Sequence, residues 1–465
     1  MKNNNTQIEE SSFRDPSGTI FYKNNKVYRQ VNNIYRTDFD LFVKSGLKNE
    51  LEDKKYIIKS KVTSLESLRV ERIYKVLETE KIPFISYPYE WSFSQLQDAA
   101  ILTLKIQEVA LKHNMSLKDA SAYNIQFYLG KPIFIDILSF EKYKEGKPWV
   151  AYRQFCQHFL APLTLMSYRD IRFNQFFKFN IDGVPLDFAS KLLPKKTWFD
   201  LSILTHLHLH AKTEKKYADK GEQVKKLKAS LKKEILMQIV KSLENKIFKL
   251  NWKVKDTQWG EYYTFTNYSR SSFNLKKEII KNYLKNIKSQ INSVWDLGGN
   301  TGEFSRISSD MNINTLSFDI DPLAVEKNYL QIKKQNEKNL LPLIFDATNP
   351  SPGIGWKNLE RKSLISRGPA DCIMALALVH HLAITNNIPF QNISEFMSLL
   401  TNKYLIIEFV PKDDSNAKKL LTLREDIFVD YNKDNFEKVF KIQFDILKIN
   451  NIKGTKRTLY LMKKK

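Results

Sequence analysis

Cysteine is almost absent from this 465-residue chain, which holds two, Cys156 and Cys372. Both stand among apolar residues, so a disulfide framework of the kind that stabilises small secreted domains is not expected. No apolar run approaches the roughly 20 residues of a membrane-spanning helix. The polar first residues are followed by Glu9 and Glu10 instead of an apolar segment, so no signal peptide is expected. The simplest expectation is a cytoplasmic protein without a transmembrane segment.

Acidic residues are scarce relative to basic ones, and the formal net charge is +23 at pH 7. Such a charge is compatible with binding to nucleic acid. No aromatic-and-basic motif for reading RNA is visible, however, and the excess is mostly lysine, which is common on solvated faces. Nucleic acid therefore stays an open alternative as a partner or substrate, and the oligomeric state is left open. With 42% apolar residues, the composition is that of a globular protein of two or three domains.

The most informative stretch runs from Val294 to Gly302 and reads Val-Trp-Asp-Leu-Gly-Gly-Asn-Thr-Gly. Its apolar start predicts the end of a buried strand, and its glycines predict a tight turn into a helix over 303–311. Glycine lets the backbone adopt positive φ and lets a ligand approach the main chain closely. The helix N-terminus adds unpaired N–H groups and the positive end of a dipole. Strand, turn and helix together predict a cofactor site at the carboxyl edge of a parallel sheet.

Polar side chains recur at the ends of the strands expected after this turn. The predicted strands cover residues 315–318, 341–345, 372–378 and 404–407. The residues that follow them are Asp319 and Asp321, Asp346 and Ala347, His380 and His381, and Glu408. An acidic residue about 20 positions past the glycine turn holds the ribose hydroxyls in doubly wound folds, which favours Asp319, with Asp321 as the alternative.

The pattern Asp-x-Gly-x-x-x-Gly at Asp296–Gly302 resembles motif I of class I S-adenosylmethionine-dependent methyltransferases, and it differs from the dinucleotide fingerprint Gly-x-Gly-x-x-Gly. The resemblance covers about residues 256–465 and implies an α/β, doubly wound, Rossmann-like domain with S-adenosyl-L-methionine as cofactor. By the resemblance, Asp346 binds the adenine amino group. Asn300 stands where the family usually has a third glycine, but asparagine tolerates left-handed φ. The implied cofactor-binding set is Asp296, Gly298, Gly299, Asn300, Gly302, Asp319, Asp321, Asp346 and Ala347.

Candidates for catalysis follow from the chemistry of methyl transfer. This is an in-line displacement, so the protein has mainly to align the acceptor and exclude water. A base is needed only where the acceptor carries a proton of high pKa. His380 and His381 are candidates because histidine titrates near neutrality, and Glu408 is a third; packing of the histidine pair against a loop is an equally good interpretation. No Asn-Pro-Pro-Tyr signature of amino methyltransferases follows the fourth strand, where Ala-Leu-Ala-Leu stands.

The whole chain resembles a family of bacterial methyltransferases related to nodulation protein NoeA. This resemblance implies a methyltransferase and favours a small metabolite or a glycan as the acceptor, but it does not fix the acceptor. In related methyltransferases the lead-in to the catalytic domain closes over the cofactor, which adds Tyr263 and Tyr268 as candidates. The stretches that carry the resemblance are Tyr87–Trp91, Leu117–Asn124, Trp295–Gly302 and Val379–Leu382.

The N-terminal part, residues 15–210, is expected to be an α+β domain. It holds Asp119, Asn124 and, after a predicted hairpin, Asp136. This order resembles protein-kinase-like and aminoglycoside-phosphotransferase-like folds, which implies that Asp119 takes the substrate proton while Asn124 and Asp136 hold Mg²⁺ for ATP. No Gly-rich phosphate loop is present, and the alternative is that Asp119 and Asn124 cap a turn. The domain is therefore expected to recognise the substrate or, alternatively, to make the enzyme a bifunctional phosphotransferase.

The remaining segments are expected to connect or flank these two domains. Residues 1–14 are polar and are predicted to form a disordered tail. Residues 211–255 are rich in lysine with apolar residues at helical spacing, which predicts a basic helical connector. Helices are also expected over 64–78 and over 93–113. No metal site is predicted apart from the kinase-like alternative.

Overall fold

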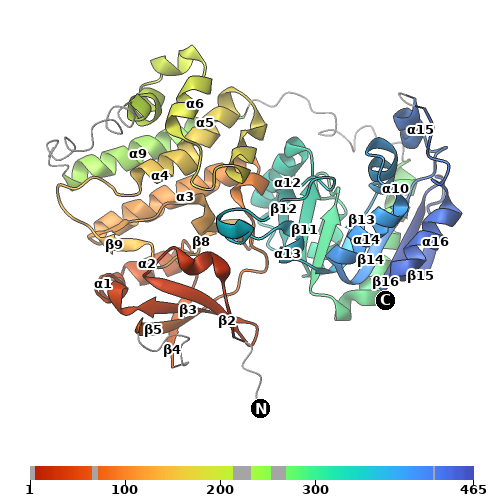
Figure 1. Cartoon of the computed structure of the whole chain (residues 1–465), viewed down its shortest axis with the longest axis horizontal. Coiled ribbons are helices and arrows are strands. Elements are labelled where there is room, and N and C mark those ends of the chain that lie inside the picture. Colours follow the sequence, from red (N-terminus) through yellow and green to blue (C-terminus); the bar gives the residue numbers. More distant parts are fainter. Residues whose placement is uncertain (1–5, 65–71, 213–231, 253–268, 423–424) are drawn as a thin grey trace. The chain divides into compact units, whose positions relative to one another are not determined.

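The computed structural model describes residues 6–64, 72–212, 232–252, 269–422 and 425–465 (Figure 1). The chain divides into two compact units, one formed by Met1–Lys253 with Ile354–Arg361 and the other by Val254–Gly353 with Lys362–Lys465. Among the described helices, none combines the length and the hydrophobicity needed to cross a lipid bilayer. Cys156 and Cys372 are both buried free thiols.

The C-terminal unit is built on a seven-stranded sheet in the order β12-β11-β10-β13-β14-β16-β15. Its strands are β10 (Ser293–Leu297), β11 (Asn314–Asp319), β12 (Leu340–Ile344), β13 (Ala370–Ala375), β14 (Thr401–Phe409), β15 (Phe444–Asn451) and β16 (Thr458–Lys464). The first five pair in parallel, whereas β16 is antiparallel to both neighbours. The chain moves outward from β10 to β12 and then returns to the other side of β10. Ligands of doubly wound sheets bind at such a reversal, outside the carboxyl ends of the strands.

Helices cover both faces of this sheet (Figure 1). They are α10 (Arg270–Ile287), α11 (Ser305–Ser309), α12 (Pro322–Gln335), α13 (Leu364–Arg367), α14 (Phe390–Leu400), α15 (Ser415–Leu421) and α16 (Lys433–Gln443). On one face, Ile280 and Leu284 of α10 pack into an apolar cluster with Val294 of β10 and Ile406 of β14. On the other face, Phe409 of β14 contacts aromatic rings of α14 and α16.

Side-chain alternation along the strands decides which polar groups approach α10. Successive residues of a strand point to opposite faces, so residues two apart share a face. Asp296 stands two residues after Val294, and Glu408 two residues after Ile406. Both carboxylates therefore lie on the α10 face, at the carboxyl ends of β10 and β14.

The structure confirms the doubly wound α/β sheet predicted for this half of the chain. All five predicted parallel strands are present, with boundaries that shift by one to three residues. The helix predicted over 303–311 is the short α11, Ser305–Ser309. The sequence analysis did not identify the antiparallel β15 and β16.

The N-terminal unit combines a five-stranded antiparallel sheet with helices, as expected of an α+β domain (Figure 1). The sheet has the order β1-β2-β3-β5-β4, with β1 (Thr6–Ile8), β2 (Gly18–Lys23), β3 (Lys26–Asn32), β4 (Ser60–Thr63) and β5 (Ile73–Thr79). Two small sheets follow, β6 (Met115–Leu117) with β9 (Phe140–Lys142) and β7 (Ile125–Tyr128) with β8 (Lys131–Phe134). Among the described residues, the α-helices of four or more residues are α1 (Arg36–Lys44), α2 (Leu47–Asp53), α3 (Phe93–Lys112), α4 (Tyr152–Phe155), α5 (Ala161–Tyr168), α6 (Leu186–Leu192) and α9 (Lys233–Lys249).

Two local predictions were wrong in this unit. The predicted disordered tail is ordered from Thr6 onward, because β1 pairs with β2 and the Glu9 carboxylate accepts a hydrogen bond of 2.9 Å from the Tyr22 hydroxyl. The predicted helix over 64–78 is a strand where it is described, because β5 pairs on both sides with β3 and β4. Residues 1–5 and 65–71 lie outside the described residues.

The Lys-rich segment expected to be a connector is described only in part. Residues 213–231 and 253–255 lie outside the described residues. The described α9 belongs to the N-terminal unit and packs on α3. Gln97 of α3 donates from Nε2 to the carbonyl oxygens of Ile247 and Leu250, at 2.9 and 2.7 Å. The end of α9 is thus fixed to α3 and is not a free linker.

Candidate active site

The turn after β10 adopts backbone conformations that its residue types permit. Gly298 and Gly302 have φ values of +77° and +83°, and Asn300 has a φ of +48°. The left-handed conformation expected of Asn300 is therefore observed, and the turn forms without the third glycine. The amides of Gly298 and Gly299 donate to the carbonyl oxygen of Phe318 at 2.8 and 2.9 Å, which ties the turn to β11. A Cβ at Gly299 would lie 2.5 Å from Ser317 Oγ, so only glycine fits there.

Asp319, at the end of β11, holds the same turn from its other side. Its Oδ2 accepts a hydrogen bond of 2.8 Å from the Asn300 amide, and its Oδ1 accepts one of 2.9 Å from the Asp321 amide. The side chain is buried, and burial raises the pKa of Asp319 to about 6. Each carboxylate oxygen keeps a second lone pair with which to accept a hydrogen bond from a ligand.

Asp296, at the end of β10, carries the least satisfied buried oxygen of the site. Its residue is 1% exposed, and its Oδ2 accepts a hydrogen bond of 2.6 Å from Ser305 Oγ. Its Oδ1 has no hydrogen-bond partner among the described residues. Burial raises the pKa of Asp296 to about 7. A buried carboxylate oxygen without a partner costs free energy until a donor or a cation reaches it, so this atom marks a place for a ligand.

These groups line a cavity of about 390 Å³ at the reversal point of the sheet, a size usual for small-molecule sites. One part of the lining is polar and comes from the turn and the strand ends: Asp296, Gly298, Gly299, Asn300, Asp319 and Asp346. Another part is apolar. It consists of Phe273 of α10, Phe304 after the glycine turn, Leu420 of α15, and three leucines that follow β13: Leu376, Leu378 and Leu382. The cavity therefore has chemistry for a charged, polar ligand and for an apolar one.

Most of the predicted cofactor residues lie on this lining, and two do not. Ala347 lines the cavity beside Asp346, whose Oδ1 accepts hydrogen bonds from the amide and hydroxyl of Thr348. Asp321 is not part of the lining; its Oδ1 caps α12 by accepting from the Leu323 amide at 2.9 Å. Gly302 is not part of it either, and serves the turn through its positive φ. The alternative in which Asp321, and not Asp319, holds the ribose hydroxyls is thus disfavoured.

The two candidate histidines differ in position. His381 lines the cavity, whereas His380 is 1% exposed and is not part of the lining. The ring nitrogens of His380 have no hydrogen-bond partner among the described residues. Burial, together with the charge of Arg457, lowers the pKa of His381 to about 4, and burial lowers the pKa of His380 as well. The expected titration near neutrality is therefore corrected: both imidazoles are neutral at pH 7, and His381 alone of the pair faces the cavity.

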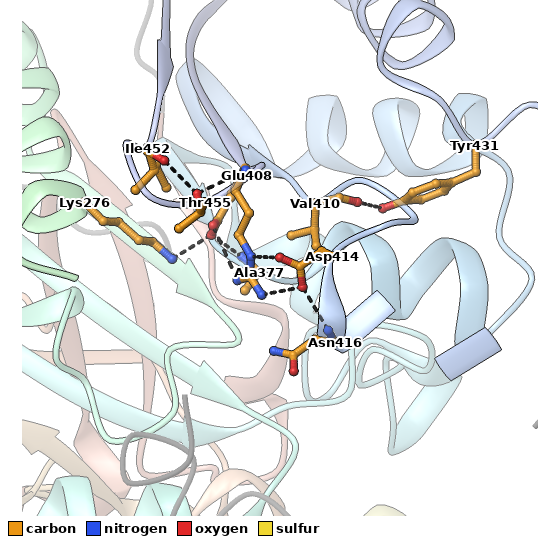
Figure 2. Close-up of polar contacts among 10 residues, drawn as sticks. Lys276, Ala377, Glu408, Val410, Asp414, Asn416, Tyr431, Ile452 and Thr455 are labelled. Carbon is orange, nitrogen blue, oxygen red and sulfur yellow. Dashed lines mark hydrogen bonds and ion pairs between the residues drawn. The ribbon is translucent and has the colours of Figure 1, made fainter. Parts of the chain in front are cut away.

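Glu408 does not face the cavity, contrary to expectation. Its side chain is fully buried, and its Oε2 accepts hydrogen bonds from Lys276 Nζ at 2.6 Å and from the Ala377 amide at 2.8 Å. Figure 2 shows Lys276 and Ala377 converging on this carboxylate. Arg457 Nη1 lies 3.6 Å from the Oε1 atom. A carboxylate surrounded in this way is an internal counter-ion, because burial of a charge requires partners of opposite sign.

Among the described residues, Lys276 is the charged residue of the lining that the sequence analysis missed. It lies on α10, is buried, and its Nζ is 4.6 Å from the centre of the Phe304 ring. A signal was present, because Lys276 interrupts the helically spaced apolar residues Phe273, Ile280 and Leu284. A lysine on such a stripe requires a buried partner, which the sequence alone does not identify. The candidates Tyr263 and Tyr268 lie outside the described residues.

The predicted N-terminal set also comes together in the fold. Asn124 Nδ2 donates to Ser139 Oγ at 3.5 Å, and Ser139 Oγ donates to Asp136 Oδ2 at 2.5 Å. Asp119 accepts a hydrogen bond of 2.9 Å from the Ser121 amide, and burial and the nearby Asp136 raise its pKa.

Asp136 is already engaged by a cation of the same unit. Arg29 of β3 forms an ion pair with it. Although burial acts to raise the pKa of Asp136, the charge of Arg29 and the hydrogen bond from Ser139 hold it below its ordinary value. Among the described residues, no group of three or more His, Cys, Asp or Glu side chains is arranged to hold a metal ion.

The chain has a relative that aligns over nearly its whole length. Nodulation protein NoeA of Rhizobium meliloti (strain 1021) is 34% identical over 458 residues, which cover 97% of this chain and 94% of NoeA. No protein-family model matches the sequence.

Solved structures are similar to this chain at a much lower level. They include magnesium protoporphyrin IX methyltransferase (ChlM) from Synechocystis PCC 6803 with bound SAH, at 14% identity and a TM-score of 0.31 over 44% of this chain and 93% of that one. N-methyltransferase NodS from Bradyrhizobium japonicum WM9 is 9% identical, with a TM-score of 0.30 over 41% and 97% of the two chains. The bifunctional kinase-methyltransferase WbdD is 13% identical, with a TM-score of 0.29 over 42% and 40%. Similarities of this size carry no inference about this chain.

The left-handed turn gives a test at Asn300. Replacement by glycine keeps the conformation available, so we expect Asn300→Gly to leave the free energy of unfolding nearly unchanged. Replacement by valine places a β-branched residue at positive φ and should lower it by about 1–2 kcal/mol. Urea denaturation measures both. Asn314→Val, at an exposed strand position of β11, is the control and should not destabilise; equal losses in the two valine variants would contradict the assignment.

The raised pKa of Asp296 gives a second test. The folded protein binds the proton of this carboxyl more tightly than the unfolded chain, so its contribution to stability falls as pH rises from about 4 to about 7. At pH 8 we expect the free energy of unfolding of Asp296→Asn, measured by urea denaturation, to exceed that of the parent by roughly 1–4 kcal/mol. This difference should shrink toward pH 4. The exposed Asp445→Asn is the control. Parallel pH profiles of parent and Asp296→Asn would refute this account.

Proposed function

The chain belongs to the family of nodulation protein NoeA, and from the geometry of its cavity we propose that it is an S-adenosylmethionine-dependent methyltransferase. The observation that carries the proposal is Asp296, whose buried Oδ1 is left without a partner among the described residues beside the glycine turn. The motif I resemblance supports a cofactor at this same turn. S-adenosylmethionine supplies an electrophilic methyl group on a sulfonium, and it carries an ammonium group as a second cation.

The polar lining suits such a cofactor in both charge and shape. Three carboxylates, those of Asp296, Asp319 and Asp346, lie on the lining, and the one lysine there is neutralised by Glu408. In this proposal Asp319 holds the ribose hydroxyls and Asp346 the adenine amino group. The close backbone of Gly298 and Gly299 leaves room for the cofactor where a side chain would fill it. Asp296 gives its free oxygen to a donor or cation of the cofactor.

A dinucleotide cofactor is the obvious alternative for a doubly wound sheet, and two features oppose it. The dinucleotide fold has six parallel strands in the order 3-2-1-4-5-6, whereas here the antiparallel β16 is inserted between β14 and β15. The turn also lacks the spacing Gly-x-Gly-x-x-Gly. The strand order is independent of the motif I resemblance, and both differences favour the methyltransferase.

We propose that the acceptor enters over the apolar part of the lining, which includes Phe273, Leu378 and Leu420. A small metabolite or one sugar of a glycan fits a cavity of this kind, and a nucleic acid stays the weaker alternative suggested by the net charge of +23. His381 is a neutral imidazole on this lining, and because a pKa of about 4 makes it a weak base, we propose that it orients a hydroxyl or amine acceptor by hydrogen bonding. The remaining work of the site is alignment and exclusion of water.

Binding of the cofactor is the direct test of this function. In calorimetric titration we expect S-adenosylmethionine to bind with a dissociation constant on the order of micromolar. Asp319→Ala removes the ribose partner and Gly299→Val fills the space beside Ser317 Oγ, so each should weaken binding about tenfold or more. Asp445→Asn, exposed on β15, is the matched control, and circular dichroism checks that each variant is folded. The absence of heat with folded parent protein would refute the proposal.

Phosphoryl transfer is the alternative function for the N-terminal unit, and it rests on the proximity of Asn124 and Asp136 through Ser139. We propose that this unit recognises the substrate, because Arg29 already neutralises the carboxylate that a magnesium ion would need. A phosphotransferase would instead bind ATP in the presence of Mg²⁺ and lose that binding in Asp136→Ala. We expect no magnesium-dependent ATP binding by the parent protein in the same calorimeter. Saturable binding that Asp136→Ala abolishes would establish the bifunctional enzyme.

A further inference from the structure

Ala377 follows β13 in a backbone conformation that alanine disfavours. Its φ is +49°, and a left-handed conformation brings the Cβ of an L-residue too close to its own carbonyl. Ala377 nevertheless lines the cavity together with its neighbours Leu376 and Leu378. Residues held in this region persist only where their surroundings fix them. The Ala377 turn, defined here as residues 376–378, therefore needs an external constraint.

Glu408 supplies that constraint through a charged hydrogen bond. Its Oε2 accepts from the Ala377 amide at 2.8 Å and, at the same time, from Lys276 Nζ at 2.6 Å. Both Glu408 and Lys276 are buried, so the interaction is shielded from water. Hydrogen bonds to an ionised, buried acceptor are the stronger kind. The turn, β14 and α10 thus meet at one carboxylate (Figure 2).

The same charges reach a second wall of the cavity. Arg457 directly precedes β16, and its Nη1 atom lies 3.6 Å from Glu408 Oε1. It also donates hydrogen bonds to both carboxylate oxygens of Asp414, at 2.8 and 3.0 Å. Asp414 caps α15 by accepting a hydrogen bond of 2.9 Å from the Asn416 amide. Leu420 of α15 lines the cavity. Lys276, Glu408, Arg457 and Asp414 form an internal network of two cations and two anions, called the ion network below.

We propose that Glu408 is a positioning residue for the acceptor half of the cavity. It acts on the Ala377 turn through its hydrogen bond and on α15 through the ion network. The proposal rests on the proposed function, in which this half takes the acceptor. It replaces the catalytic role that the sequence suggested for Glu408. One carboxylate sets the distance between two walls that come from different parts of the chain. Shape selection among acceptors thus depends on a residue that does not touch them.

Amide hydrogen exchange, followed by mass spectrometry, tests the proposal without an acceptor. Glu408→Gln keeps the shape of the side chain and removes its charge, which leaves Lys276 and Arg457 without their shared counter-ion. We expect exchange to become about tenfold faster or more in the peptide covering 375–382 and also across α15, which Glu408 reaches through Arg457. Faster exchange in 375–382 with unchanged exchange in α15 would overturn the shared constraint.

A second variant guards against failure of Glu408→Gln to fold. Asp414→Asn keeps an oxygen for the helix cap but weakens the pair with Arg457, and it should accelerate exchange in 375–382 as well as in α15. The control is Asp426→Asn, which breaks the exposed ion pair with Lys412 and should leave 375–382 unchanged. Identical exchange in 375–382 for Asp414→Asn and its control would also overturn the proposal.

The strained residue itself gives a test of coupling. Glycine adopts positive φ without penalty, so Ala377→Gly needs less support from Glu408. Glu408→Gln should lower the melting temperature by a smaller amount in the Ala377→Gly background than in the parent. Equal losses in the two backgrounds would mean that Glu408 does not hold the turn.

These outcomes are separate from the fate of the proposed function. Hydrogen exchange and melting are measured on the protein alone, whereas the function fails if S-adenosylmethionine does not bind. Asp414→Asn should bind S-adenosylmethionine within about threefold of the parent, because Asp414 lies outside the cavity lining. A change in exchange with intact cofactor binding is the expected combination. Loss of binding in Asp414→Asn beyond that range would place the ion network in the cofactor half and refute the assignment to the acceptor half.

Discussion

Burial of carboxylates at one edge of the central sheet is the constraint on which the C-terminal unit depends. Parallel strands end at the same edge, so Asp296, Asp319 and Glu408 come close together by topology alone. Charges of one sign cannot be buried together without partners. Backbone amides donate hydrogen bonds to Asp319, and Lys276 and Arg457 neutralise Glu408. At Asp296, burial raises the pKa of the carboxyl.

These buried carboxylates differ in how they are satisfied. Glu408 serves as an internal counter-ion, while Asp296 has a pKa of about 7 and an Oδ1 atom without a hydrogen-bond partner among the described residues. A protein that needed only stability would replace Asp296 by a residue with no carboxyl to bury.

The N-terminal unit shows the same physics with a different outcome. Asp136 is half-buried and near Asp119, and Arg29 of β3 forms an ion pair with it from within the unit. A side chain that would serve as a metal ligand in a phosphotransferase is here part of an internal ion pair. The contacts within the unit therefore account for Asp119, Asn124 and Asp136 without a bound metal.

The sequence by itself determined the doubly wound sheet, the glycine turn and the acidic strand ends, because these are local: Gly298 to Gly302 and Asp319 show their roles in spacing and residue type. Asparagine at position 300 permits a left-handed conformation, and the structure shows that Asn300 adopts it. Tertiary structure alone decided that Glu408 points at Lys276 and not at the cavity, that only His381 of its pair lines the cavity, and that 73–79 is a strand. Those outcomes depend on which side chain or strand packs opposite, and a partner distant in the chain leaves no mark in the local pattern.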